Sequence, residues 1–179
     1  PVIVEQLLAM VRKIAARGVT IILVEQSVNV ALELADTAYF MERGRIRFHG
    51  PTTELVERDD LLRSVFLGDT AASPTEPSKQ SSNGAAHPSP HDATANPSMA
   101  LSVRGLSRRF GGLTAVNQVD VDVAEREIVG FIGPNGAGKT TLFDLIGGTT
   151  PTDAGRIELA GHDLSSATAS ERARSGLGR

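Results

Sequence analysis

Residues 133–140 read Gly-Pro-Asn-Gly-Ala-Gly-Lys-Thr and match the phosphate-binding pattern G-x-x-x-x-G-K-[ST] at every fixed position. The preceding run, 128–132, is short, apolar and strand-like, and the following run, 140–146, is helix-like. Strand, glycine loop and helix form the context in which this motif binds phosphate. The alternative interpretation is an ordinary glycine-rich turn between a strand and a helix.

The chemistry of this loop predicts ATP and Mg²⁺ as its ligands. Glycines allow successive backbone N–H groups to turn toward a phosphate, and the helix N-terminus adds partial positive charge. We expect Lys139 to reach the β- and γ-phosphates and the Thr140 hydroxyl to bind Mg²⁺. The predicted nucleotide-binding residues of the loop are Gly133, Pro134, Asn135, Gly136, Ala137, Gly138, Lys139, Thr140 and Thr141.

The sequence around the loop resembles the N-terminal part of an ABC-transporter ATP-binding cassette. The wording G-P-N-G-A-G-K-T-T-L is typical of that family, as are the P-T-D-A-G-R-I stretch at 151–157 and the G-H-D-L turn at 161–164. The segment R-F-G-G-L-T-A-V at 109–116 is similar to the opening of the branched-chain amino-acid subgroup. One departure is Arg126, which stands in a turn where the family usually has glycine.

The same resemblance assigns a role to Phe110. The family places an aromatic ring at this position, where it stacks on adenine, and stacking requires only a flat π face. Taken alone, the alternating apolar pattern of 101–110 predicts instead that Phe110 packs in the hydrophobic core. Both interpretations remain open at the level of the sequence.

The first part of the chain resembles the C-terminal end of a separate cassette of the same family. Its opening apolar residues follow helical spacing up to Gly18, and 19–24 reads as a buried parallel strand. The family follows this strand with an acidic residue and a switch residue that senses the γ-phosphate, and the pair here is Glu25-Gln26. Gln26 is therefore the candidate catalytic switch, and a solvated polar residue at a strand end is the alternative. The apolar positions of the helix are Val4, Leu7, Leu8, Val11, Ile14 and Ala15.

The segment 32–41 matches the family's passage from a helix into a strand, 42–45 reads as a hairpin turn, and 46–48 as its return strand. The segment 59–68 resembles the end of a cassette. We therefore assign residues 1–68 to the C-terminal part of a first cassette and residues 99–179 to the N-terminal part of a second cassette.

Residues 69–98 between these parts form a predicted linker. Five of the nine prolines of the chain lie there, and no apolar residue larger than alanine occurs before Met99. Such a segment cannot bury enough surface to offset the entropy of ordering it. We expect a flexible, disordered tether.

Composition narrows the possible partners. The net charge of −3 does not indicate the positively charged surface that nucleic-acid-binding proteins carry. The absence of cysteine excludes disulfides and thiolate chemistry, and no run reaches the roughly 18 apolar residues of a membrane span. The resemblance implies membrane permease subunits and a second ATP-binding cassette as partners. It also implies a cytoplasmic location, peripheral on the inner face of the cell membrane.

Three parts that a hydrolysing cassette of this family carries do not occur in the sequence. These are a Q-loop glutamine, an L-S-G-G-Q signature and a Walker B strand that ends in Asp-Glu. We therefore expect a piece of a tandem two-cassette ABC importer for branched-chain amino acids or related solutes. The intact protein would hydrolyse ATP, whereas this piece would bind nucleotide only. The alternatives are a tandem-cassette ABC ATPase without transport and an inactive, truncated folding unit.

The predicted fold is α/β, a partial P-loop NTPase with a parallel core sheet and an antiparallel β subdomain. In the family, the strands that correspond to 19–24 and 37–41 lie on either side of the strand before the phosphate loop. We therefore expect 19–24 and 37–41 to flank 128–132 within this one chain. The competing arrangement is two half-cassettes with no contact across the linker.

Overall fold

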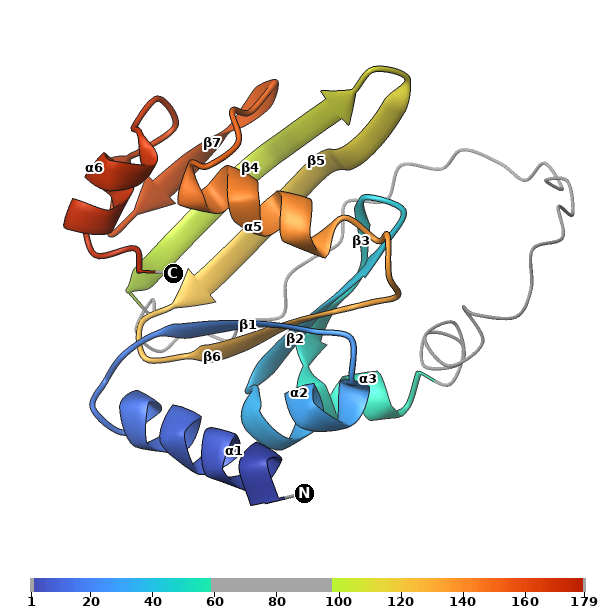
Figure 1. Ribbon diagram of the computed structural model, residues 1–179, viewed down its shortest axis with the longest axis vertical. Helices are drawn as coiled ribbons and strands as arrows, with labels where there is room; N and C mark the ends of the chain where they lie inside the picture. The colour runs from blue at the N-terminus through green and yellow to red at the C-terminus, as the bar shows by residue number, and fades with distance from the viewer. Residues whose placement is uncertain (1, 59–97, 179) are drawn as a thin grey trace, which may run out of the picture.

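The computed structural model describes residues 2–58, the N-terminal half, and residues 98–178, the C-terminal half. The predicted linker and the segment 59–68 lie outside the described residues, except for Ser98 at the linker's end. Two four-stranded sheets pack around one helix, as Figure 1 shows. The predicted α/β fold class, with a parallel core sheet and an antiparallel subdomain, is confirmed.

The first sheet has the strand order β1-β6-β2-β3. Its strands are β1 (Ile21–Glu25), β6 (Ile128–Ile132), β2 (Thr37–Glu42) and β3 (Arg45–Pro51). Both β1 and β2 pair with β6 in parallel, and β3 returns antiparallel to β2. The prediction that 19–24 and 37–41 flank 128–132 is therefore confirmed, and the arrangement without contact between the halves is wrong.

The second sheet is antiparallel throughout and has the order β5-β4-β7-β8. Its strands are β4 (Met99–Phe110), β5 (Leu113–Ala124), β7 (Ala154–Leu159) and β8 (His162–Asp163). Helix α5 (Lys139–Gly147) packs between the two sheets and contributes its buried apolar residues to their shared core. The other helices are α1 (Val2–Ala15), α2 (Val28–Leu34), α3 (Thr52–Val56) and α6 (Ala169–Arg174).

Strand β6 is the centre of the first sheet, and all five of its residues are buried. One face contributes Val129 and Phe131 to the core shared with α5 and the second sheet. The other face packs against α2, where Gly130 lies so close to Ala31 and Ala35 that an added Cβ would stand 3.2–3.4 Å from their methyl groups. The apolar run that precedes the phosphate loop is thus covered on both faces.

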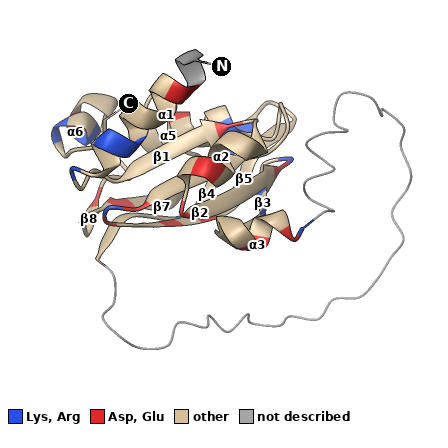
Figure 2. Cartoon of the chain, turned by 90° about the horizontal axis from the view of Figure 1, so that it is seen from below, with Lys and Arg blue, Asp and Glu red and all other residues tan. Residues whose placement is uncertain are grey.

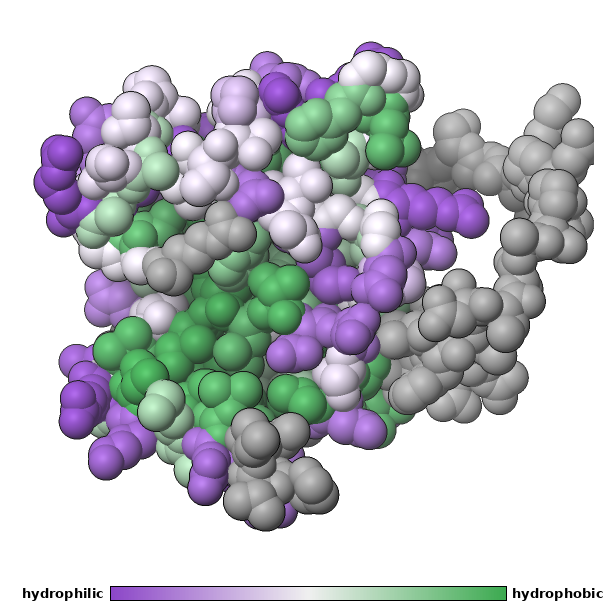
Figure 3. Space-filling view, viewed as in Figure 1, coloured by the Kyte–Doolittle hydropathy of each residue, from purple (hydrophilic) through white to green (hydrophobic). Residues whose placement is uncertain are grey.

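The prediction of a buried strand at 19–24 is wrong in its degree of burial. Strand β1 begins at Ile21, and all five of its residues are only half-buried. The physical reason is its position, because β1 forms the edge of the sheet. Figure 3 shows apolar residues gathered along this side, where a cleft of about 540 Å³ is lined by Ile22, Phe143 and Leu177 among others.

Helix α1 confirms the predicted helical spacing, although several of its apolar positions are exposed. Leu8 is buried, whereas Leu7 and Ile14 are 56% and 40% exposed. Among the described residues, no helix is long and apolar enough to cross a membrane.

Tyr39 on β2 ties the two sheets together. Its hydroxyl donates to the carbonyl of Asp122 on β5 (2.9 Å) and accepts from the Asp122 N–H (2.8 Å). Burial, at 2% exposure, raises the pKa of Tyr39 well above its ordinary value of 10.0. The neutral phenol is therefore the form that the folded protein requires.

Replacing Tyr39 with phenylalanine is expected to lower the free energy of unfolding by about 1–3 kcal/mol at pH 7, because both Asp122 groups lose their partner. In the parent protein the raised pKa makes this stabilisation complete below pH 10 and lost progressively above it. The chain has a single tyrosine, so tyrosinate absorbance reports on this residue alone. A titration midpoint near 10 in the folded protein would show that the phenol is solvated.

Candidate nucleotide-binding site

The phosphate loop joins the end of β6 to the start of α5. Gly138, at φ 101°, is the N-cap of the helix, and Gly136 has φ 79°. Gly133 has φ 150°, and a Cβ at this position would overlap the carbonyl oxygen of Met41 on β2. The loop therefore needs glycine both for its backbone conformation and for close approach of the N-terminal half.

Lys139 follows the last glycine of the phosphate loop, and its side chain folds back into that loop. Its side chain is buried, and Nζ donates to the carbonyl oxygens of Gly133 (2.5 Å) and Pro134 (3.0 Å). Burial lowers the pKa of Lys139, and the negative charge of Glu25 opposes this change. The loop thus holds a cation at its centre, with two main-chain oxygens as its polar partners.

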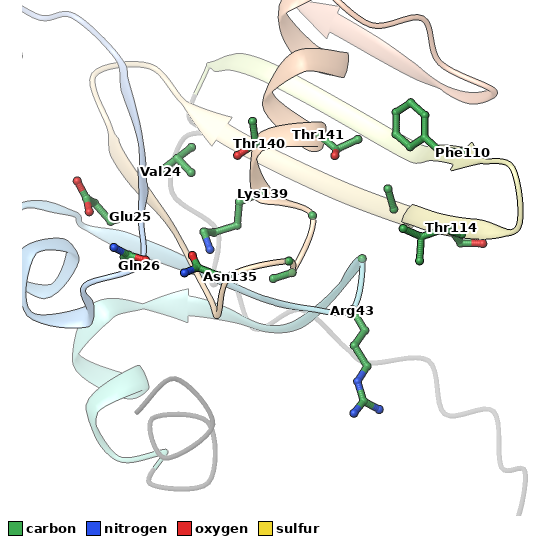
Figure 4. Close-up of a pocket in the computed structure, with 16 residues that line it drawn as sticks. Val24, Glu25, Gln26, Arg43, Phe110, Thr114, Asn135, Lys139, Thr140 and Thr141 are labelled. Carbon is green, nitrogen blue, oxygen red and sulfur yellow. The ribbon is translucent and has the colours of Figure 1, made fainter. Parts of the chain in front are cut away.

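A cleft of about 770 Å³ opens beside the loop, and both halves of the chain line it (Figure 4). The C-terminal half contributes the loop, the start of α5 and the β4–β5 hairpin. The N-terminal half contributes the end of β1 and the turn between β2 and β3. The lining residues are Val24, Glu25, Gln26, Arg43, Gly44, Phe110, Leu113, Thr114, Ala115, Asn135, Gly136, Ala137, Gly138, Lys139, Thr140 and Thr141.

Phe110, the last residue of β4, lies on the wall of this cleft and is 47% exposed. The guanidinium carbon of Arg108 lies 4.8 Å from its ring centroid, a cation–π contact. The interpretation as a core phenylalanine is therefore wrong. Stacking on adenine remains a prediction, to which the exposed ring in the cleft gives support.

Gln26 directly follows β1 and is exposed on the same cleft wall as Lys139. Parallel pairing of β1 with β6 produces this placement, because Glu25 stands opposite Ile132, one residue before the loop. Strand ends that are 107 residues apart in sequence thus meet at one edge of the sheet. Its role as a switch remains a prediction.

Thr140 is exposed on the cleft, so its hydroxyl is free to serve as the predicted Mg²⁺ ligand. Within the described ranges, no group of three or more His, Cys, Asp or Glu residues could hold a metal ion by itself. A hydroxyl oxygen is of the ligand type that Mg²⁺ accepts, and Mg²⁺ usually takes its other ligands from phosphate oxygens and water. Glu25 is the carboxylate on the cleft wall.

Gly44 in the N-terminal half makes one contact with the phosphate loop and one with β5, and sequence reasoning missed both. The Gly44 N–H donates to the carbonyl of Ala137 (2.8 Å), and the Gly44 carbonyl accepts from the Asn117 N–H (2.9 Å). Gly44 has φ 77°, and a Cβ there would stand 2.7 Å from the carbonyl oxygen of Ala115. The pattern Glu-Arg-Gly-Arg predicts a turn but does not indicate what the turn touches.

Replacing Gly44 with alanine is expected to destabilise the fold by about 1–3 kcal/mol, since the methyl group collides with main chain that cannot move independently. The matched control is Gly161→Ala in the β7–β8 turn. Gly161 has nearly the same φ, 78°, but nothing within 4 Å of an added Cβ. Denaturant unfolding separates the collision from backbone strain, and equal losses in both variants would exclude the proposed close contact.

Residues 116–178 match the family model described as ABC transporter. The high-affinity branched-chain amino acid transport ATP-binding protein LivG of Salmonella typhimurium is 48% identical over 79 residues, which are 44% of this chain and 31% of that protein. The Fe(3+) ions import ATP-binding protein FbpC of Streptomyces coelicolor is 43% identical over 76 residues, which are 42% of this chain and 22% of that protein.

A putative ABC transporter ATP-binding protein of Methanosarcina acetivorans is 26% identical over 168 residues, 94% of this chain and 29% of that protein. Among solved structures, a nucleotide-free ATP-binding cassette from an ABC transporter is 29% identical with a TM-score of 0.43, covering 44% of this chain and 31% of the other. The chain spans less than a third of the length of the curated relatives it matches. The match to the ABC transporter family model therefore covers the part of the chain that holds the phosphate loop.

Proposed function

We propose that the chain is the nucleotide-binding part of an ABC importer subunit that energises uptake of branched-chain amino acids or related solutes. The observation that carries the proposal is the cleft in which Lys139, at the end of the glycine loop, faces residues of the opposite half. Relatives that import branched-chain amino acids and iron match about the same share of the chain. The proposal of branched-chain amino acids as the solute therefore rests on the sequence of residues 109–116, which resembles the branched-chain subgroup.

The lining residues divide the cleft into regions that fit the parts of Mg·ATP. Phe110 offers a ring face for adenine at the hairpin end, and the loop offers N–H groups and the Lys139 cation for the phosphates. The Thr140 hydroxyl offers a ligand for Mg²⁺. Gln26 lies where its amide can hydrogen-bond a terminal phosphate, although an amide cannot carry charge or transfer a proton.

Hydrolysis belongs to the intact protein in this proposal. The sequence contains no Walker B Asp-Glu pair and no signature motif, so the piece lacks groups that would position water and close the site. Membrane permease subunits and a second cassette complete the assembly, which places the protein on the inner face of the cell membrane.

We also propose an order of parts along the chain: the end of one cassette at 1–68, a tether at 69–98 and the start of another cassette at 99–179. The Methanosarcina acetivorans relative supports this order, because its alignment runs through both halves of the chain and the segment between them. The aligned region is only 29% of that relative.

Calorimetric titration tests the proposal with two ligands, Mg·ATP and Mg·tripolyphosphate. Both are expected to bind the parent chain, and Phe110→Ala is expected to weaken ATP binding roughly 3- to 30-fold, since stacking contributes about 0.7–2 kcal/mol. Binding of tripolyphosphate, which has no base, should not change. If neither ligand binds the parent chain, the result supports the inactive folding unit. If Phe110→Ala weakens the affinity for both ligands equally, Phe110 is excluded as the adenine contact.

A further inference from the structure

The first sheet is assembled from two separate halves, and neither half supplies it alone. Among the described residues, β1 and β2 share no ladder with each other and meet only through β6. Strand β6 in turn has no ladder partner among the described residues of its own half. The N-terminal half therefore lacks the centre of its sheet, and the C-terminal half presents two unpaired edges of a fully apolar strand.

Specific polar contacts reinforce the ladders between the halves. The Asp36 N–H donates to the Ile128 carbonyl (2.8 Å), and the Ile128 N–H donates to Asp36 Oδ2 (2.9 Å). The Arg126 N–H donates to Thr20 Oγ1 (2.8 Å), which fixes the turn before β6. We call the whole contact between the N-terminal and C-terminal halves the joint. Together with the hydrogen bonds of Tyr39 and Gly44, these contacts fix a single register in the joint, which apolar packing alone would not do.

The connection between the halves enters and leaves on opposite sides of the molecule. In Figures 1 and 2 the end of α3 and the start of β4 stand at opposite sides in both views. The residues between them, 59–97, are the only covalent link between the halves. The contacts between the halves would be the same whether both halves belong to one chain or to two chains. The length of the link at 59–97 therefore decides which of these arrangements forms.

We propose that the joint between the halves also forms reciprocally between two copies of the chain. The N-terminal half of one copy then completes β6 and the cleft of the second copy, and the second copy does the same in return. Each cleft would combine Gln26 and Arg43 of one copy with Lys139 of the other. The proposal concerns assembly of the site, and its mass readout is independent of the proposed nucleotide function.

The closed monomer and the exchanged dimer contain the same contacts, so the balance between them depends on effective concentration. With the flexible tether that the sequence predicts, each half meets its own partner at roughly millimolar concentration, which favours the monomer in dilute solution. A connection too short to cross the molecule removes the monomer altogether, and exchange is then the remaining way to pair β6.

The test is a chain from which residues 62–95 are removed. The five remaining linker residues reach about 18 Å, whereas a domain of this size has a radius of gyration of about 15 Å and a correspondingly larger width. We expect the shortened chain to double in mass by light scattering, while the full chain stays monomeric at micromolar concentration. A shortened chain that remains a folded monomer would overturn the proposal.

A disulfide identifies the copy that supplies each half. The chain has no cysteine, so Thr20→Cys with Arg126→Cys introduces a single pair where the Arg126 main chain contacts the Thr20 side chain. Oxidation should link two chains covalently in the shortened protein and leave one chain in the full protein, and each single-cysteine variant is the control.

If the shortened chain aggregates, the same pair is oxidised in full chains that are refolded together at concentrations up to about 1 mM. A linked dimer that grows with concentration supports exchange. A disulfide that stays within one chain at every concentration overturns it.

Discussion

Lys139→Ala is expected to weaken binding of Mg·ATP at least about 100-fold. The substitution removes the cation that faces two phosphates, and each charge-assisted hydrogen bond of this kind contributes about 1.5–3 kcal/mol. Removal also leaves the carbonyls of Gly133 and Pro134, which now hold Nζ at 2.5 and 3.0 Å, without that partner. Affinity and loop order should therefore fall together.

Calorimetry measures this effect, with Lys13→Ala as the matched control because Lys13 is an exposed lysine on α1. The control should bind like the parent chain. The same preparations should show no ATP hydrolysis above the level of Lys139→Ala. Equal affinity in Lys139→Ala and the parent chain would mean that nucleotide, if bound, does not use this loop.

Arg172→Met is expected to destabilise the fold by roughly 3–6 kcal/mol. Arg172 on α6 is 3% exposed, and its Nη1 donates to the carbonyls of Leu145 and Ile146 at the end of α5, both at 2.7 Å. The Leu145 carbonyl keeps the Gly148 N–H as a donor (3.2 Å), whereas the Ile146 carbonyl loses the Arg172 donor, and a buried carbonyl without a donor costs about 1–3 kcal/mol. The Arg172 side chain also donates to the carbonyls of Ala167 and Ser165, so these bonds are lost as well. Loss of the cation also removes a favourable interaction with the C-terminal end of the α5 dipole.

Arg174→Met on the same helix is the matched control, because Arg174 is exposed and its replacement should change stability by no more than about 0.5 kcal/mol. Denaturant unfolding of both variants gives the comparison. A loss in Arg172→Met that is no larger than that of the control would show that the α5 carbonyls find other partners.

Much of the site could be predicted because its residues are close together in sequence. The motif at 133–140, the strand before it and the helix after it are confirmed as β6 and α5 with the loop between them. The departure at Arg126 also has a local explanation. Its φ of 65° explains why the family usually has glycine in that turn.

What the sequence could not predict depends on contacts between distant segments. Nothing in the pattern of β1 reveals that it forms a sheet edge, so its apolar run indicated burial that it does not have. Arg172 looks like an ordinary charged residue of a short helix, and only the fold places it under α5. Gly44 is read correctly as a turn, but its support of Ala137 depends on the pairing of β2 with β6.

We propose that both halves of the chain build one nucleotide site. Titration of the isotope-labelled full chain with Mg·ATP, followed residue by residue through its amide NMR signals, tests it most directly. We expect shifts in the loop 133–141 together with shifts at Gln26 and Gly44, and Lys139→Ala should abolish both sets. Shifts confined to residues 98–178, with Gln26 and Gly44 unchanged at saturation, would contradict it.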